Sequence, residues 1–185
     1  MYYQTSCIFP IGPVTLGSDG ENLLGLWIEG QKYFGASVPG AMVPRDDLPV
    51  FHRTKEWLAR YFGGERPDIG ALPLAPCGGA FRKEVWGLLC EIPYGQVTTY
   101  GEIAKKMAAR VGRQSMSAQA VGGAVAHNPI SIIIPCHRVV GVNGSLTGYA
   151  GGLKKKIQLL TLEGVDVTKL SVPSRETVRQ EMPGG

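Results

Sequence analysis

The chain has 185 residues and a net charge of +4, with 44% hydrophobic and 18% charged residues. This length suits one domain or two small ones with a real core, and the composition excludes an intrinsically disordered chain. No apolar run approaches the length of a membrane span, and residues 1–10 do not read as a secretory signal. We therefore expect a cytoplasmic protein with no membrane partner.

The charge is distributed unevenly along the chain. Residues 1–78 carry six Lys and Arg against eight Asp and Glu, whereas residues 79–185 carry thirteen against seven. The C-terminal part is therefore the basic one, and a polyanion such as nucleic acid is a plausible partner for it. A solvated basic face would give the same counts.

The cysteines and histidines match no metal-binding pattern. Their positions are Cys7, Cys77, Cys90, Cys136, His52, His127 and His137. No C-x-x-C pair and no zinc-finger spacing occurs among them. We expect free thiols, no metal site and no cofactor.

A stretch rich in Gly and Pro divides the chain. It predicts an N-terminal domain over residues 1–63, a linker over 64–79, a second domain over 80–168 and a polar tail over 169–185. The tail is expected to lack order.

The N-terminal domain reads as a small sheet with a helix packed on it. Residues 2–9 and 14–28 have strand character, and residues 17–20 supply a turn between two strands. Residues 48–62 place apolar side chains at helical spacing, so one face of that helix is expected to be buried.

The second domain begins with helices. Residues 81–91 form the first, which residues 93–95 end. The next starts at Thr99, where the spacing to Glu102 predicts a capping box.

A third helix follows a basic turn. Ser117 can cap a helix over residues 118–127, and two short helices across a turn predict a helix-turn-helix. The third helix consists mostly of Ala and Gly, which suits close approach to the minor groove of DNA. Tight packing inside the domain is the alternative reason for these small residues.

A cysteine motif carries the candidate chemistry. Residues 131–134 predict a short buried strand that leads into Cys136, His137 and Arg138. Basic neighbours lower the pKa of a thiol, and the thiolate is a strong nucleophile. Successive side chains of extended chain point to opposite faces, so we expect a water to link His137 to the sulfur. A purely structural Cys-His pair is the alternative.

Residues 135–139 resemble the active-site motif of the O6-alkylguanine-DNA alkyltransferases, also called methylated-DNA–protein-cysteine methyltransferases. Five other segments also resemble the family, and they occur along the chain in the family's order: residues 92–104, 120–124, 128–129, 148–153 and 159–164. The resemblance covers roughly residues 80–165. It implies an α/β (α+β) fold with a small ribonuclease-H-like N-terminal domain and a helical, winged-helix-like C-terminal domain.

The resemblance also implies an activity. Such a protein binds double-stranded DNA containing O6-alkylguanine, flips the damaged base out and transfers its alkyl group to Cys136 in a single turnover. O4-alkylthymine is a further substrate to consider. No cofactor or metal takes part, and the protein is expected to act as a monomer.

The catalytic roles carry over residue by residue. His137 matches the histidine that deprotonates Cys136 through a water, and Glu163 matches the carboxylate that orients this histidine. Asn128 matches the residue that holds the turn before the cysteine. Tyr100 matches a tyrosine that helps to rotate the nucleotide and contacts the guanine.

Two further sets of residues follow from the resemblance. The expected substrate-binding residues are Val139, Tyr149, Ala150 and Lys156, although residues 154–156 could equally form a solvated basic face. The expected DNA-binding residues are Ala118, Gln119, Ala120, Gly122 and Arg138.

The chain departs from the family pattern at Gln119, where the family usually has an arginine that fills the gap left by the flipped base. Gln119 lacks the charge and the planar guanidinium, so weaker flipping or DNA binding is the hypothesis that follows. Arg110 and Arg113 in the preceding turn are candidate substitutes.

Three other classes of protein are alternatives. A non-enzymatic lesion-binding protein would lack the cysteine, which is present here. A helix-turn-helix regulator would need more base-reading side chains than the third helix offers. A hydrolytic Cys-His enzyme would act on an acyl substrate over many turnovers.

Overall fold

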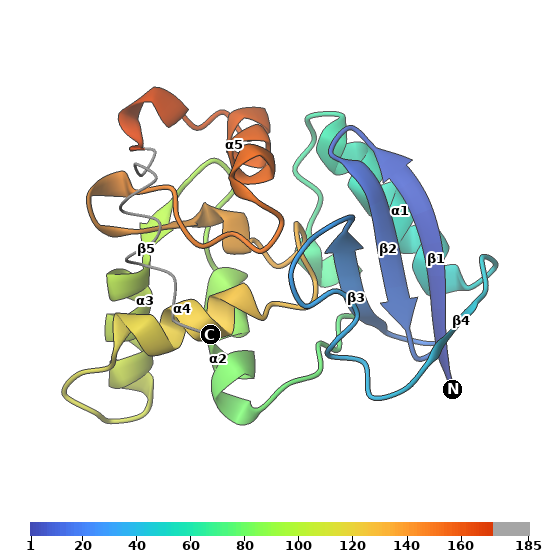
Figure 1. The fold of residues 1–185 in the computed structure, drawn as a ribbon, viewed down its shortest axis with the longest axis horizontal. Coiled ribbons are helices and arrows are strands. Elements are labelled where there is room, and N and C mark those ends of the chain that lie inside the picture. The colour runs from blue at the N-terminus through green and yellow to red at the C-terminus, as the bar shows by residue number, and fades with distance from the viewer. Residues whose placement is uncertain (172–185) are drawn as a thin grey trace.

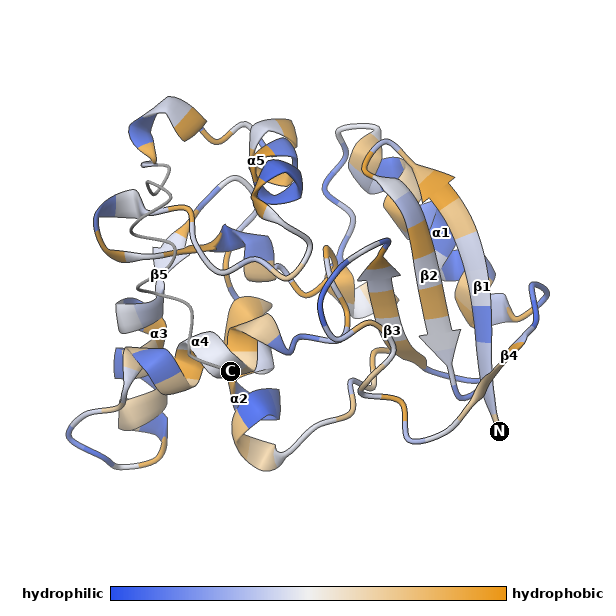
Figure 2. Ribbon diagram, viewed as in Figure 1, coloured by the Kyte–Doolittle hydropathy of each residue, from blue (hydrophilic) through white to orange (hydrophobic). Residues whose placement is uncertain are grey.

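The computed structural model describes residues 1–171 and places a sheet with one helix beside a group of helices and loops (Figure 1). Figure 2 shows hydrophobic bands recurring along β2 of the sheet and a hydrophobic end of β1. The main hydrophobic core runs through both parts, from Leu58 and Ile28 to Val85 and Ile103. Within residues 1–171, no helix is long and apolar enough to cross a membrane.

The N-terminal sheet has four strands, and the two predicted strand regions are confirmed. The strands are β1 (Tyr2–Phe9), β2 (Gly12–Ser18), β3 (Leu23–Ile28) and β4 (Met42–Pro44). Their order is β3-β2-β1-β4, with antiparallel pairs except for the parallel pair β1–β4. The turn between β2 and β3 lies slightly later than predicted because β2 extends to Ser18.

Helix α1 (Pro49–Phe62) forms where the apolar spacing predicted it and packs on this sheet. It buries Phe51, Trp57, Leu58 and Tyr61. These side chains recur at helical spacing, so one face of α1 joins the core and carries Tyr61 toward the C-terminal part.

The segment over residues 64–79 packs against the sheet. It contains a short 3-10 helix, η1 (Ile69–Ala71), and Leu74 pairs with Leu23 of the edge strand β3. Backbone bonds from Leu23 to Pro73 and from Ala75 to Leu23 fix it there. This segment is thus part of the fold where it meets β3.

The C-terminal part is mainly helical. Its helices are α2 (Ala80–Leu89), α3 (Tyr100–Arg110), α4 (Ala118–Ala126) and α5 (Leu153–Leu162), with 3-10 turns η2 (Cys136–Arg138), η3 (Val142–Gly144) and η4 (Val167–Lys169). Two short parallel strands, β5 (Thr98–Thr99) and β6 (Val139–Val140), join the start of α3 to the segment after η2.

Both predicted hydroxyl caps form, but within the described residues the capping box at Thr99 lacks its return bond from the Thr99 amide to the Glu102 carboxylate. The Thr99 hydroxyl accepts from the Glu102 amide at 3.1 Å, and the Ser117 hydroxyl accepts from Gln119 and Ala120. The Glu102 carboxylate pairs with Lys105 at 3.5 Å. Each cap satisfies backbone donors at the helix start and so sets where α3 and α4 begin.

The strand predicted over residues 131–134 is wrong. These residues form buried turns, and Ile132 has a φ of +71°. The Asn128 side chain causes this path, because its amide donates to Ile134 and its oxygen accepts from Ile130. The apolar run therefore reflects burial, with a single bridge from Ile130 to Leu26 of β3.

The predicted start of the tail also needs correction. Lys169 lies in η4, and Ser171 pairs with Ser145 and accepts from the Leu146 amide. The folded part therefore continues to Ser171, because this backbone pairing holds the segment on the 145–146 loop. The rest of the predicted tail, residues 172–185, lies outside the described residues.

Candidate active site

The turn η2 places three functional side chains in the interior. Cys136, His137 and Arg138 are all buried, and the backbone there is a 3-10 turn and not the extended chain that the sequence suggested. A 3-10 turn spaces successive side chains by about a third of a turn. His137 and Arg138 can therefore both reach one carboxylate while Cys136 lies apart from them.

That carboxylate belongs to Glu163, which ends α5. Its Oε2 lies 2.6 Å from Nε2 of His137, and its Oε1 accepts from Nε of Arg138 at 2.7 Å. The Gly95 amide adds a bond to Oε1 at 3.2 Å. Burial acts to raise the pKa of the Glu163 carboxyl, but His137 and Arg138 outweigh it and hold that pKa well below its usual range.

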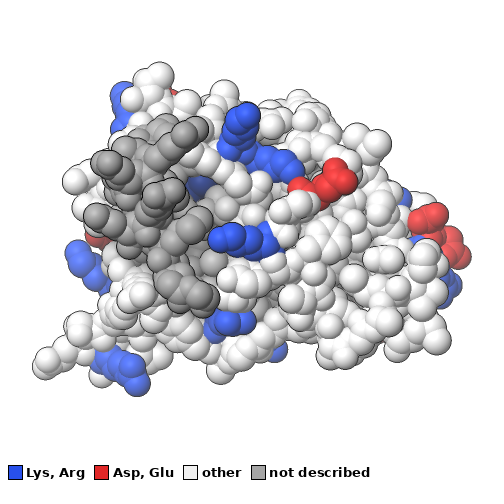
Figure 3. Space-filling view, viewed as in Figure 1, with Lys and Arg blue, Asp and Glu red and all other residues white. Residues whose placement is uncertain are grey.

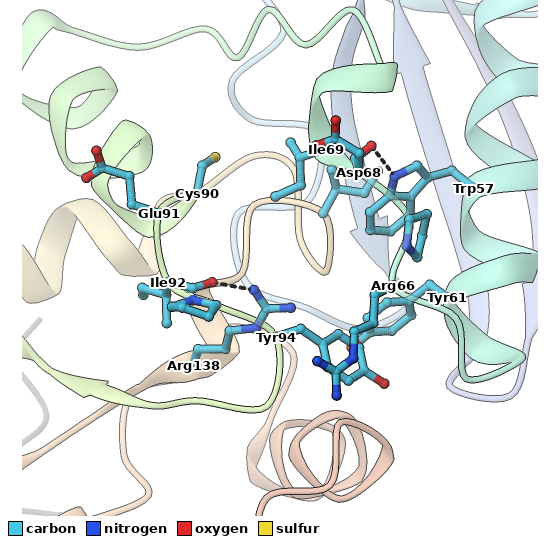
Figure 4. Close-up of a pocket in the computed structure, with 13 residues that line it drawn as sticks. Trp57, Tyr61, Arg66, Asp68, Ile69, Cys90, Glu91, Ile92, Tyr94 and Arg138 are labelled. Carbon is cyan, nitrogen blue, oxygen red and sulfur yellow. Dashed lines mark hydrogen bonds between the residues drawn. The ribbon is translucent and has the colours of Figure 1, made fainter.

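Arg138 was expected to bind DNA, and its position contradicts that role. Only 7% of the residue is exposed, and it holds Glu163 with two nitrogens. Its third donor, Nη1, binds the Ile92 carbonyl at 2.7 Å, as Figure 4 shows. The buried carboxylate draws the guanidinium inward, so Arg138 has no charge left to offer a phosphate.

The Cys136 thiol was expected to have a lowered pKa, but the structure gives the opposite direction. Burial raises the pKa of Cys136, and this effect outweighs the hydrogen bond from Asn128 and the charge of Lys156, which both act to lower it. Arg138 is occupied by Glu163 and supplies no compensating charge. The resting thiol is therefore protonated.

His137 is fully buried and able to accept a proton. Burial lowers the pKa of His137, although the neighbouring Glu163 opposes this shift. With Nε2 bonded to Glu163, the imidazole has Nδ1 left over, and Nδ1 has no hydrogen-bond partner among the described residues. The ring is thus a neutral base whose orientation is fixed by a carboxylate.

Asn128 lies where the chain turns from α4 into the cysteine segment. Besides its bonds to Ile130 and Ile134, its side chain hydrogen-bonds to Cys136 and opposes the rise in the thiol's pKa. One amide group therefore shapes the turn and contacts the nucleophile.

Tyr100 and Lys156 hold the substrate loop, a name we give to residues 147–152 because they include the expected substrate-binding residues Tyr149 and Ala150. The Tyr100 hydroxyl donates to the Thr147 carbonyl at 3.2 Å, and Nζ of Lys156 donates to Thr147 and to Val139. Lys156 is 1% exposed, so the alternative of a solvated basic face is wrong for this residue. Burial lowers its pKa to about 8.

Gly148 allows this loop to approach Tyr100. It has a φ of +75°, and a Cβ placed there would lie 2.8 Å from the Tyr100 hydroxyl. An L-residue would be strained and would clash, so the loop requires glycine at this point.

Tyr149 and Ala150 lie at the junction of the two parts. The Ala150 carbonyl accepts from the Lys32 amide of the N-terminal part at 3.1 Å. The Tyr149 hydroxyl is buried without a hydrogen-bond partner within residues 1–171; burial raises the pKa of Tyr149, and Cys136 adds to this rise when it is ionised. Tyr149 is therefore close to the nucleophile.

Three of the four expected DNA-binding residues of α4 lie in its accessible first turn. Ala118, Gln119 and Ala120 are exposed, while Gly122 is half-buried beside the Tyr100 ring. Because the Tyr100 hydroxyl also bonds to Thr147, this contact connects α4 to the substrate loop through Tyr100. In Figure 3, Lys and Arg on the visible face lie mainly over the C-terminal part.

The two candidate substitutes for the missing arginine differ in availability. Arg110 pairs with Glu91 at 3.1 Å and with Glu84 at 3.6 Å, so its charge is engaged. Arg113 is exposed, makes no ion pair in the described part of the chain, and lines a surface hollow together with Ala120.

Sequence reasoning missed one contact to the site. The hydroxyl of Tyr61, on α1 of the N-terminal part, donates to Oε2 of Glu163 at 2.5 Å. The two residues are 102 positions apart, and no local pattern could have connected them.

A mainly helical part that buries a cysteine next to a hydrogen-bonded histidine–glutamate pair is typical of the class of transferases that use a cysteine as nucleophile. Comparison with known sequences agrees with this class. Residues 80–165 match the profile described as "6-O-methylguanine DNA methyltransferase, DNA binding domain", and residues 1–76 match the ribonuclease-like domain of the same name.

Whole-length relatives make the assignment specific. The chain is 46% identical to the methylated-DNA–protein-cysteine methyltransferase of Methanosarcina acetivorans over 89% of this chain and 99% of that one. It is 42% identical to the Haemophilus influenzae protein of the same name, over 88% and 87%. The structure of Mycobacterium tuberculosis OGT in complex with DNA superposes with a TM-score of 0.75 at 36% identity, covering 96% and 99%.

The chain belongs to the O6-methylguanine DNA methyltransferase family. Its activity is that of a methylated-DNA–protein-cysteine methyltransferase, which repairs O6-methylguanine in DNA. The ribonuclease-like N-terminal domain and the helical C-terminal domain expected from the sequence are confirmed. This activity excludes the three alternatives considered from the sequence, namely a helix-turn-helix regulator, a hydrolytic Cys-His enzyme and a non-enzymatic lesion-binding protein.

Proposed function

We propose that Cys136 is the alkyl acceptor and that His137 and Glu163 activate it. The observation that carries this proposal is the buried hydrogen bond between Nε2 of His137 and Glu163. It leaves Nδ1 of the same ring to accept the proton of the thiol. The Cys136 proton passes through a bridging water to Nδ1. The sulfur then attacks the alkyl carbon, a C–S bond forms, and the bond from that carbon to guanine O6 breaks.

The balance of protons follows from the environments of the two groups. The neutral His137 becomes an imidazolium, and the adjacent Glu163 carboxylate stabilises that charge. The released guanine anion takes up a proton from Tyr100; the imidazolium of His137 then loses its extra proton to solvent and Tyr100 regains one from solvent, so both side chains end neutral. The thioether on Cys136 is stable and nothing restores the thiol, so each molecule acts once.

We also assign roles to the expected substrate-binding residues. Tyr149 and Ala150 border the base, and the Val139 carbonyl offers an acceptor at its edge. Lys156 holds the Val139 and Thr147 carbonyls in place by donating a hydrogen bond to each. Asn128 keeps Cys136 in line with this pocket.

We further propose that the partner is duplex DNA containing O6-alkylguanine, which meets α4 through Ala118, Gln119, Ala120 and Gly122. The exposure of Ala118, Gln119 and Ala120 and the complex of Mycobacterium tuberculosis OGT with DNA support this proposal. We infer a cytoplasmic monomer in which residues 64–79 connect the two domains.

Intact-protein mass spectrometry tests the assignment. The protein is incubated with a duplex that holds one O6-methylguanine, and peptides are then mapped. One methyl group on Cys136, with lesion loss equal to the amount of protein, is the expected result. Cys136→Ser abolishes transfer, while the matched Cys90→Ser variant retains it. A methyl group on another cysteine, or loss of lesion beyond one per protein, overturns the proposal.

A further inference from the structure

Tyr61 is a buried tyrosine that reaches the active site from the other domain. Only 1% of the residue is exposed, and its hydroxyl donates to Oε2 of Glu163 at 2.5 Å. The same oxygen receives Nε2 of His137 at 2.6 Å and Nη2 of Arg138 at 3.2 Å. Three donors therefore share one oxygen, and Tyr61 is the one supplied by the N-terminal domain.

The ring of Tyr61 is fixed by aromatic neighbours. It stacks on Trp57 with centroids 5.6 Å apart and 9° between planes, and the Tyr94 ring meets it edge to face. Trp57 is itself held by a bond from Nε1 to the Asp68 carbonyl at 2.9 Å (Figure 4). The hydroxyl is thus aimed at Glu163 by packing, and little ordering is needed during the reaction.

The hydroxyl of Tyr61 remains a donor throughout the working range of pH. Burial and the adjacent Glu163 carboxylate both raise the pKa of Tyr61 far above its ordinary value. A phenol that never ionises keeps donating to the carboxylate. Each donor to Oε2 spreads its negative charge, so the carboxylate stabilises the imidazolium form of His137 less strongly.

We propose that Tyr61 is a positioning residue that acts through Glu163 to keep His137 neutral and ready to accept the Cys136 proton. This inference rests on the roles proposed above for His137 and Glu163. It makes the N-terminal domain part of the active site, because the site lacks one of its carboxylate donors without α1.

Other charged and titratable groups face this cluster and remain constant in the test. They come from η2, the loop after α2, the 64–79 segment, the substrate loop and α5: Cys136, Arg138, Tyr94, Arg66, Tyr149 and Lys156. A change confined to the Tyr61 hydroxyl therefore isolates one donor among several electrostatic contributions.

The test compares Tyr61→Phe with the parent in the full chain. The single-turnover rate constant of methyl transfer from an O6-methylguanine duplex is measured from pH 5 to 9. Loss of the donor strengthens the carboxylate's hold on the imidazolium, so the pKa of His137 rises. The acid limb of the profile is expected to move to higher pH by about half to one unit, with the plateau changed less than about twofold.

Tyr94→Phe is the matched control. Its hydroxyl donates to the Leu162 carbonyl at 3.3 Å and makes no hydrogen bond to Glu163 within the described residues, yet its ring touches Tyr61. Tyr94→Phe removes the same hydroxyl oxygen from the same aromatic cluster, so the acid limb of its pH–rate profile is expected to stay in place. An equal shift in both tyrosine variants overturns the role of Tyr61.

Glu163→Gln separates failure of this inference from failure of the site assignment. If Glu163→Gln leaves the profile unchanged, the proposed roles of His137 and Glu163 are wrong. If Glu163→Gln alters the profile and Tyr61→Phe does not, only the role of Tyr61 is wrong.

A measurement on the parent protein covers the case in which Tyr61→Phe fails to fold. The proton of so short a bond from a hydroxyl to a carboxylate gives a far-downfield NMR signal. With 15N-labelled protein, this signal is distinguished from the His137 ring proton because it shows no splitting by nitrogen. Its presence in the parent and loss in Glu163→Gln support the inference, and its absence from a parent that gives the split His137 signal overturns it.

Discussion

Replacing Arg138 with methionine removes the cation from a buried cluster while keeping much of the side-chain length. The variant loses both bonds from the guanidinium to Glu163 and the bond to the Ile92 carbonyl. The carboxylate would then remain buried without its permanent positive partner.

The expected cost follows from what stays behind. Removing one partner of a buried ion pair typically costs about 3–5 kcal/mol. Glu163 keeps donors from Tyr61, His137 and Gly95, so the lower end of that range applies. We expect Arg138→Met to lower the free energy of unfolding by about 3 kcal/mol.

Urea unfolding at pH 7, followed by the fluorescence of the three tryptophans, measures this loss. With a slope of about 2 kcal/mol/M, the midpoint falls by about 1.5 M. Arg113→Met is the matched control, because Arg113 is exposed and unpaired within residues 1–171, and its midpoint should barely move.

The opposite outcome would refute the reasoning. If Arg138 bound a phosphate, Arg138→Met would leave the midpoint unchanged and would reduce the salt dependence of DNA affinity by about one unit of slope. That pair of results would restore the DNA-binding role expected from the sequence and contradict the buried ion pair.

Two further predictions concern Lys156 and Gln119. Because the pKa of Lys156 is lowered to about 8 in the folded state, unfolded chains bind more protons between pH 8 and 10, and stability should rise with pH there. Urea unfolding should show the parent gaining about 2 kcal/mol relative to Lys156→Met between pH 7.5 and 10, and parallel curves would contradict the buried ammonium. Gln119→Arg should increase the methyl-transfer rate at limiting DNA and steepen the salt dependence of binding by about one unit, measured by quench-flow and fluorescence anisotropy. If neither the rate nor the salt dependence increases, Gln119 does not limit DNA binding or methyl transfer in this protein.

Local patterns in the sequence predicted several of the regular elements. The spacing of apolar side chains predicted α1, and the hydroxyl residues Thr99 and Ser117 predicted where α3 and α4 begin. Both signals act between residues a few positions apart, so they are readable without the fold. The order of motifs around Cys136 likewise identified the family before any geometry was known.

The electrostatic properties of the site were decided by the tertiary structure. Basic neighbours in the sequence suggested a lowered pKa for Cys136, but burial raises it because Arg138 is committed to Glu163. The run of residues 131–134 has the composition of a strand, yet Asn128 bends it into turns.

What the sequence determined by itself is the family and the helices α1 to α4, because these depend on an ordered motif, short-range periodicity and caps. Only the folded chain decided which side chains meet. Tyr61 reaches Glu163 across 102 positions because α1 packs against the other domain, and Arg138 faces inward because a buried carboxylate requires a partner. Burial and long-range contact set the protonation of Cys136 and His137, and neither quantity is encoded in neighbouring residues.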